Sequence, residues 1–340
     1  MRTGKAVIGI GCSFVEGQGA IDQELYETRD WKYSELGHPM YLDLTLEEAK
    51  KLTLQYPSLE LIPDHYPDKM DEIINCRYMG VDNSFTHYLA NTCFGGEYAA
   101  INLGISGCGN RASIRELYYH PDIKWDKLEE IIVIYSPSGL ERFDFVNDNW
   151  SEYGRWVCMW PHHASMPESE HGKPVHGLWK AYNEALHSEK FEVLEQIGHA
   201  IELKNWCDLN NAQLIITPGF DRRYTREHFT KRLRDSVERS SDRNIVNVVK
   251  EKLPISDIEK YVDLFPWNNM FYPDGYPTFM DLAVAQERDD WESTHFYTFL
   301  GKGSAENWVT LCAHPSAKAH ALFAGKLYER ITKNYKKCIL

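Results

Sequence analysis

The chain has 340 residues, of which 43% are hydrophobic and 13% aromatic, and this is enough apolar sequence to fill a sizeable core. Its formal net charge is −13 at pH 7, which argues against the basic surface that nucleic-acid-binding proteins normally present. The same acidic balance makes an anionic membrane surface an unsuitable partner. The composition therefore predicts a globular protein with neither a nucleic acid nor a membrane as its partner.

The chain begins almost directly with a strand pattern, and we see no signal-peptide segment and no apolar stretch of membrane-spanning length. Its eight cysteines are dispersed and contain no C-x-x-C pair, which is typical of reduced thiols rather than of a disulfide scaffold. We therefore expect a soluble protein of the cytoplasm, or of a particle such as a virion that is assembled there.

Four short apolar runs are rich in Ile and Val and show no clean alternation, as strands covered on both faces tend to be. They predict a parallel sheet, and they lie at Ala6–Ile10, Tyr98–Leu103, Ile131–Tyr135 and Gln213–Thr217. Helical patterns alternate with these strands, so right-handed crossovers would give an α/β fold, a three-layer α/β/α sandwich with a central parallel sheet. Such sheets place ligands beyond the carboxyl ends of their strands.

The helical patterns carry apolar residues at a period close to 3.6. Ser84 can cap the first of them, and Pro315 can start the last, which we expect to close over the sheet. The residues that mark the four helices are Phe85, Tyr88, Leu89 and Cys93; Ile114, Leu117 and Tyr118; Phe191, Leu194, Ile197 and Ile201; and Ala319, Leu322, Phe323, Leu327 and Ile331.

Three long segments interrupt this pattern, approximately at 20–82, 145–182 and 254–308. They are rich in turn-forming, aromatic or proline residues, and none has enough periodic apolar sequence for a second domain. We therefore predict one domain over residues 1–340, decorated by three insertions.

The first strand ends in Gly11-Cys12-Ser13-Phe14, which places a small hydroxyl where a buried strand breaks into a glycine-rich turn. This position predicts Ser13 as a nucleophile. Near the other end of the chain, His314 stands just ahead of Pro315 and the final helix. A serine and a histidine form a nucleophile and its base, provided that the fold brings the two side chains together.

The second strand also opens into glycines, between Asn102 and Asn110. Small residues there allow backbone N–H groups to face a ligand, and the side-chain amide of Asn110 can add a donor. These are the components of an oxyanion hole. Asn110 is equally suited to cap the helix that follows, and both interpretations stay open.

These motifs, in this order, resemble those of the SGNH (GDSL-like) hydrolase superfamily, most closely its divergent members from bacteriophage and bacterial genomes. Gly11-Cys12-Ser13-Phe14 is similar to the first motif, with Ser13 as the nucleophile. Asn102 through Gly107 is similar to the second, with Gly107 as an oxyanion donor, and His314-Pro315 to the last. The resemblance implies a flavodoxin-like sandwich of SGNH hydrolase type that needs no metal and no organic cofactor.

Two departures from the superfamily bear on mechanism. The aspartate that usually stands two or three positions before the histidine is replaced by Cys312 and Leu311. The third motif of the superfamily, which contains an Asn, is replaced by Tyr135–Phe143. A backbone carbonyl could then fix the histidine tautomer in a Ser-His dyad. Alternatively, an acid from an insertion, such as Asp281 or Glu306, could reach the ring.

We therefore expect a serine hydrolase that cleaves an ester, with an O-acyl group on a carbohydrate or another small polar molecule as substrate. Ser13 attacks the carbonyl, His314 moves the proton, and Gly107 and Asn110 contribute to the oxyanion hole. The alternative is a catalytically weak or inactive SGNH fold that acts in binding or as a structural component of a phage particle. The three retained motifs favour the enzyme, the absent acid favours the alternative, and a homo-oligomer is compatible with both.

For several other polar side chains we expect a structural role rather than a functional one. The basic run from Arg222 to Arg234 is diluted by acidic residues and predicts a solvated helix face. We expect Arg142 to form an ion pair rather than a substrate contact. The cysteines and histidines do not have the spacing of zinc ligands. We expect the cysteines to pack as small apolar side chains and the histidines to lie in a solvated loop. The cysteines are Cys12, Cys108 and Cys312, and the histidines are His162, His163, His171 and His176.

Overall fold

The computed structural model places most of the predicted core. The described residues are 4–17, 20, 82–104, 108–119, 123–146, 156–159, 177, 189–239, 257–295, 298, 308–310 and 314–338. The predicted insertions at 20–82 and 145–182 lie almost entirely outside these residues, as do the four histidines of the second one.

The sheet contains four parallel strands in the order β2-β1-β3-β6. Gly11, the last residue of β1, is paired with Gly104 of β2 on one side and with Ser136 of β3 on the other, so the carboxyl ends of these strands meet at one edge. The four apolar runs of the sequence are thus confirmed as a parallel sheet. The bounds are Gly4–Gly11 for β1, Ala99–Gly104 for β2, Leu128–Ser136 for β3 and Ala212–Ile216 for β6.

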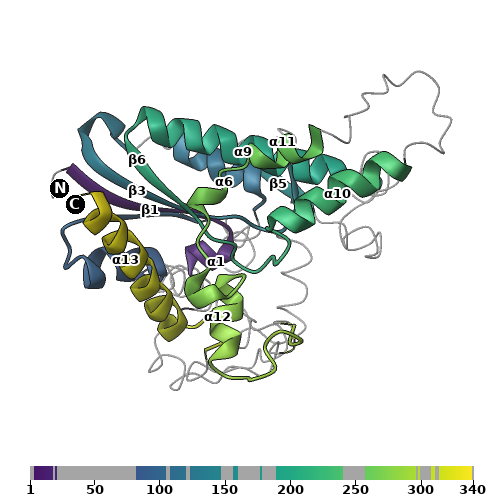
Figure 1. Ribbon diagram of the computed structural model, residues 1–340. Helices are drawn as coiled ribbons and strands as arrows, with labels where there is room; N and C mark the ends of the chain where they lie inside the picture. Colours follow the sequence, from purple (N-terminus) through teal and green to yellow (C-terminus); the bar gives the residue numbers. More distant parts are fainter. Residues whose placement is uncertain are drawn as a thin grey trace.

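Helices cover both faces of the sheet (Figure 1). Alternate residues of β1 enter two separate cores, because side chains of a strand point to opposite faces in turn. Val7 packs in the first core and Ile8 in the second. Against the first lie α5 (Phe85–His87), the π-helix η4 (Tyr88–Cys93), α12 (Phe279–Ala285) and α13 (Ala317–Cys338); against the second lie α6 (Asn110–Tyr119), α9 (Glu189–Leu209), α10 (Arg226–Arg239) and α11 (Ile258–Asp263).

The four predicted helices are all present, with two differences in detail. The first of them continues beyond α5 as the π-helix η4. Phe191 was expected on the buried side of its helix, yet its side chain in the first turn of α9 is 44% exposed. In the rest of that stripe, Ile197 is buried in the second core, and Leu194 and Ile201 are partly buried against it.

The described part of the segment at 254–308 belongs to the core. Val262 of α11 is buried in the second core, and Phe279 and Leu282 of α12 are buried in the first. The backbone N–H of Phe271 donates to the carbonyl of Ile216 at 2.8 Å, beside an isolated parallel bridge to Met270. This segment therefore covers part of the outer edge of β6, which would otherwise expose unpaired backbone groups.

A hairpin and several short 3₁₀ helices lie outside the sheet. The antiparallel hairpin of β4 (Phe143–Val146) and β5 (Trp156–Met159) was not predicted from the sequence. Short 3₁₀ helices among the described residues are η5 (Trp125–Lys127), η10 (Trp267–Asn269) and η11 (Pro273–Gly275). Among the residues described, no helix has both the length and the apolar composition needed to cross a membrane.

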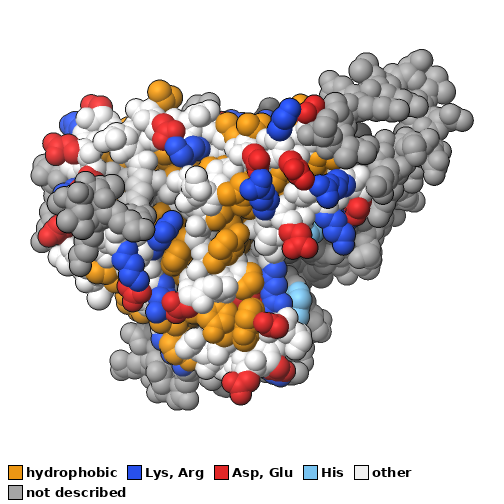
Figure 2. Space-filling model, viewed as in Figure 1, with side chains coloured by type: hydrophobic (Ala, Val, Ile, Leu, Met, Phe, Trp, Pro, Cys, Tyr) orange, Lys and Arg blue, Asp and Glu red, His pale blue; other side chains and the backbone are white. Residues whose placement is uncertain are grey.

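The part of the basic run from Arg226 onwards lies in α10, where three arginines form ion pairs. Arg226 contacts Asp263, Arg232 contacts Glu189, and Arg234 lies 2.8 Å from Glu259. Figure 2 shows basic and acidic side chains interspersed over this face rather than gathered by sign. These pairs are partly or fully exposed, so each contributes little to stability, and they fit the predicted solvated helix face.

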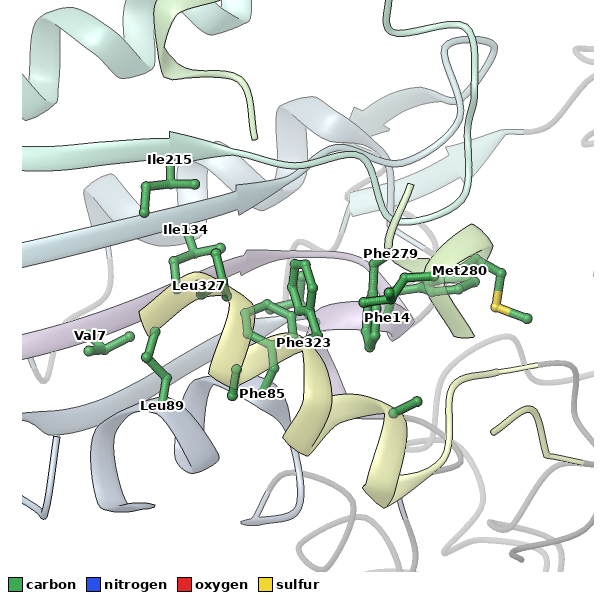
Figure 3. Packing of buried hydrophobic residues seen from close by; sticks show 14 of the residues in the cluster. Val7, Phe14, Phe85, Leu89, Ile134, Ile215, Phe279, Met280, Phe323 and Leu327 are labelled. Atoms are coloured by element: carbon green, nitrogen blue, oxygen red, sulfur yellow. The ribbon is translucent and has the colours of Figure 1, made fainter. Parts of the chain in front are cut away.

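The first core is centred on aromatic side chains from segments that are far apart in the sequence (Figure 3). The ring of Phe323 stacks on Phe279 with 4.3 Å between centroids, and it meets Phe85 edge-on at 5.0 Å. All three side chains are fully buried. The final helix is thereby held against α5 and α12, close to the carboxyl edge of the sheet.

We predict that Phe323→Ala lowers the free energy of unfolding by about 3–5 kcal/mol, because it removes a fully buried ring and leaves a cavity between three elements. Leu209→Ala is the matched control, since the side chain of Leu209 is 87% exposed, and its effect should stay below about 0.5 kcal/mol. Urea unfolding followed by circular dichroism measures both. Equal effects of the two substitutions would contradict the packing described.

Candidate active site

Ser13 is the first residue of α1 (Ser13–Glu16), a single helical turn at the carboxyl end of β1. The carbonyl of Cys12 accepts hydrogen bonds from the N–H groups of Val15 at 2.9 Å and Glu16 at 3.1 Å. Gly17 then ends the turn in the left-handed conformation, with a φ of 94°. The serine thus lies where the sequence predicted it, at a sharp strand-to-helix turn, with 4% of its surface exposed.

Two glycines allow this turn to lie directly against the sheet. A Cβ atom on Gly11 would lie 2.4 Å from the carbonyl oxygen of Ser136, and one on Gly104 would lie 2.3 Å from the backbone nitrogen of Glu16. Both distances are shorter than atoms can approach without a backbone shift. The absence of side chains at these two positions therefore fixes how close Ser13 lies to β2 and β3.

Asn102, near the end of β2, ties the turn down. Its Nδ2 donates to the carbonyl of Val15 at 2.8 Å and to Oγ of Ser84 at 2.9 Å, and its Oδ1 accepts from the N–H of Gly104 at 2.9 Å. The Ser84 hydroxyl was expected to cap the following helix, but its side chain makes no capping bond. The sequence offered one signal for this role, an amide within an otherwise apolar strand.

His314 meets Ser13 across 301 positions of sequence. Its Nε2 lies 2.9 Å from Oγ of Ser13, which is hydrogen-bonding distance. The imidazole also packs on the ring of Phe14, with 4.9 Å between centroids. If Nδ1 carries the proton, Nε2 is free to accept one from the serine, which is the arrangement of a nucleophile with its general base.

The backbone around His314 is held by a short antiparallel pairing. The carbonyl of His314 accepts hydrogen bonds from the N–H of Thr310 at 2.8 Å and from its Oγ1 at 3.0 Å. Val309 forms an antiparallel bridge with Pro315, and the N–H of Ser316 donates to the carbonyl of Trp308 at 2.9 Å. We call residues 308–310 and 314–316 the histidine arm.

Asp281, one of the two acids considered for the histidine, is engaged elsewhere. Its Oδ1 accepts from Nε and Nη2 of Arg222 at 2.8 and 2.5 Å, and its Oδ2 accepts from the hydroxyl of Thr278 at 2.7 Å. Both oxygens therefore stabilise the start of α12 rather than the imidazole. The other acid, Glu306, lies outside the described residues, as do Leu311 and Cys312.

Asn110 lies at the start of α6, and its amide is fully used. Oδ1 accepts from the N–H of Ser138 at 2.7 Å, and Nδ2 donates to the hydroxyl of Tyr224 at 2.9 Å. The capping role falls to Asp144, whose carboxylate accepts from two N–H groups at the start of α6. Asn110 thus joins α6 to the loop after β3, whereas Gly107 lies outside the described residues.

Arg142 makes contacts beside the site. Its Nη1 donates to the carbonyl of Cys108 at 2.9 Å, and its guanidinium lies over the ring of Phe220, 5.4 Å from the centroid. Phe220 in turn stacks on Phe14 at 5.0 Å. These contacts connect Arg142 to His314 through two stacked rings.

The thiols near Ser13 are buried. Sγ of Cys108 lies 3.3 Å from the carbonyl of Gly11 and 2.9 Å from Oγ of Ser113, and burial raises the pKa of this thiol well above its ordinary value. Cys12 is fully buried as well. Within the described part of the chain, no group of three or more His, Cys, Asp or Glu residues is arranged to hold a metal ion.

The imidazole of His320, on the final helix, is fully buried, and no sequence pattern had singled it out. The N–H of Phe85 donates to its Nδ1 at 3.0 Å, so Nε2 carries the proton, and the ring packs against Phe85 and Phe279. Burial, followed by the charge of His314, lowers the pKa of His320 to about 3. Its position on the same helical stripe as Phe323 and Leu327 was the signal for a histidine in the core.

Comparisons with protein-family models, with curated proteins and with solved structures give no match for this chain. The structure itself shows an α/β fold with a four-stranded parallel sheet. The chemical capacity of the site depends on its own residues, above all on the contact between Ser13 and His314.

We predict that Asn102→Leu lowers the free energy of unfolding by about 1–3 kcal/mol, because it leaves the carbonyl of Val15 and the N–H of Gly104 without their partner. Asn91→Leu is the control, since Asn91 is an exposed residue of η4. Thermal and urea unfolding measure both variants. If Asn102→Leu were no more destabilising than Asn91→Leu, the turn would not depend on the amide.

The titration of His320 predicts a loss of stability in acid. An unfolded histidine takes up a proton near pH 6.5, whereas the folded pKa of His320 is about 3, so the contribution to stability is complete above pH 6.5 and is lost as the pH falls towards 3. Between pH 7 and pH 5 this contribution decreases by about 2 kcal/mol.

His320→Asn tests this prediction, because Oδ1 of asparagine keeps an acceptor where Nδ1 stood but does not titrate. The variant is expected to be less stable at pH 7, yet to lose about 2 kcal/mol less than wild type between pH 7 and pH 5. Urea unfolding at the two pH values measures the difference. Equal losses in both proteins would show that His320 does not titrate as described.

Proposed function

We propose that this protein is an SGNH-type serine hydrolase that cleaves an ester bond. The observation that carries the proposal is the 2.9 Å contact between Oγ of Ser13 and Nε2 of His314. The location of the pair supports it, because ligands of open α/β sheets bind beyond the carboxyl ends of the strands. The order β2-β1-β3-β6, with helices on both faces, is compatible with the three-layer sandwich of that superfamily.

In the proposed mechanism, Oγ of Ser13 attacks the acyl carbonyl while Nε2 of His314 takes the hydroxyl proton. The N–H groups of Ser13 and Gly107 donate to the oxyanion of the tetrahedral intermediate. The intermediate collapses, the ester C–O bond breaks, and His314 returns the proton to the departing alcohol. Water then attacks the acyl-enzyme with His314 again as base, releasing the acid and restoring the Ser13 hydroxyl.

Asn110 and Phe14 have supporting roles beside Ser13 and His314. Asn110 holds the loop after β3 against α6, so we remove its amide from the expected oxyanion donors. Phe14 limits the rotation of the imidazole through ring contact. Proton transfer between Ser13 and His314 needs neither a metal nor an organic cofactor, so we propose none.

For the substrate we propose an O-acyl group on a carbohydrate or another small polar alcohol, an assignment that rests on the superfamily resemblance. For the location we propose the cytoplasm or a virion, which rests on the dispersed cysteines and on the same resemblance. The thiols of Cys12, Cys93, Cys108 and Cys207 are all free, as a reducing compartment would keep them.

A second candidate is an inactive SGNH fold that serves as a binding or structural protein, for example in a phage particle. One observation favours it: both carboxylate oxygens of Asp281 are bonded to Arg222 and Thr278, so this acid does not orient His314. A dyad without an acid is slower than a triad, because the imidazolium formed during proton transfer is less stabilised. The two candidates differ in whether the Ser13 hydroxyl is activated.

The test is labelling of purified protein with a fluorophosphonate probe, followed by intact mass. We expect one adduct on the wild type, none on Ser13→Ala, and labelling slowed by about 10²-fold or more in His314→Ala, because the general base is lost. Ser293→Ala, which alters an exposed serine, should be labelled like the wild type. Circular dichroism establishes that each variant is folded.

Folded wild-type protein that takes no adduct would overturn the hydrolase proposal and favour the binding protein. An adduct that persists in Ser13→Ala would place the reactive group elsewhere. Loss of the adduct in Ser13→Ala with a strongly reduced rate in His314→Ala would justify a screen of acyl-ester substrates.

A further inference from the structure

Glu287 lies just beyond α12, and its side chain binds backbone N–H groups of the histidine arm. Its Oε1 accepts hydrogen bonds from the N–H of Trp308 and from the N–H of Val309, the latter at 2.9 Å. A carboxylate that accepts from backbone N–H groups forms charge-assisted bonds, which are stronger than neutral ones. One side chain therefore fixes two consecutive residues of the arm.

Residues 308–310 pair with the backbone around His314. Val309 is bridged to Pro315, the residue after the histidine, and Thr310 donates twice to the carbonyl of His314. A shift of residues 308–310 would therefore move the backbone on which the imidazole stands. The two hydrogen bonds of the Glu287 carboxylate are thus linked to the imidazole through this backbone.

Glu287 is itself held in place relative to the sheet. At the start of α12, the N–H groups of Phe279 and Met280 donate to the carbonyls of Pro218 and Gly219, both at 2.9 Å, in the loop that follows β6. The next residue of that loop, Phe220, stacks on Phe14 beside the nucleophile. One loop at the carboxyl edge of the sheet thus supports α12 and contacts the Ser13 turn.

We propose that Glu287 is a positioning residue for His314. Its carboxylate sets the distance between the imidazole and Ser13 by anchoring the histidine arm to α12. The inference rests on the proposed hydrolase function, and it assigns to this chain a carboxylate that orients the base through the backbone rather than through the ring. A displacement of about 1 Å between reacting groups costs on the order of 10²-fold in rate, so the anchor has a measurable effect.

Three substitutions separate geometry from charge. Glu287→Gln keeps an oxygen acceptor at the same reach and removes the charge. Glu287→Asp keeps the charge and shortens the side chain by one methylene, and Glu287→Ala removes the acceptor. Asp289→Ala is the matched control, because it removes a nearby exposed carboxylate that makes no bond to the arm.

The experiment measures the rate of fluorophosphonate labelling against probe concentration, together with the melting temperature and amide hydrogen exchange of residues 308–316. The inference predicts that Glu287→Gln and Asp289→Ala are labelled within about threefold of wild type. It predicts that Glu287→Asp and Glu287→Ala are slowed by about 10–100-fold in the maximal rate, with probe affinity unchanged and faster exchange confined to the arm.

Each other outcome overturns a different statement. Normal labelling in all variants would overturn the positioning role. Normal labelling in Glu287→Asp with slow labelling in Glu287→Gln would also overturn it, because the charge of the side chain rather than its length would then matter. A rate that falls only in step with global unfolding would make Glu287 purely structural. Absence of labelling in folded wild type would overturn the hydrolase proposal itself, and the inference with it.

Discussion

The candidate site depends on one steric constraint, the direct seating of the Ser13 turn against the carboxyl edge of the sheet. The turn approaches so closely because Gly11 and Gly104 have no side chains. Asn102 then bonds the turn to β2. A serine on a looser loop would lose the fixed geometry that a nucleophile needs, since proton transfer to a base requires hydrogen-bonding distance.

The histidine reaches this fixed serine from the far end of the chain. The final helix is packed by the aromatic cluster around Phe323, whereas the residues just before it are held by backbone pairing and by Glu287. The two supports differ in kind: apolar burial sets where the helix lies, and directional hydrogen bonds set where the imidazole of His314 lies. A site made from distant segments needs both, because burial alone does not fix orientation.

The sequence predicted the features that depend on local pattern. Apolar runs located the four strands, and the break after β1 located Ser13. It could not predict contacts that depend on tertiary packing, such as the use of both oxygens of Asp281 by Arg222 and Thr278. The same limit applies to Asn110, whose amide suits a helix cap or an oxyanion donor equally well and is instead bonded to neighbouring segments.

Trapping of an acyl-enzyme tests the central claim most directly. The protein is mixed with p-nitrophenyl acetate, quenched in acid and digested, and the peptides are mapped by mass. The account predicts an acetyl group on the peptide that contains Ser13, formed quickly and lost on longer incubation as water completes the reaction. No acetylation of Ser13 in folded protein, or acetylation of lysines alone, would contradict it.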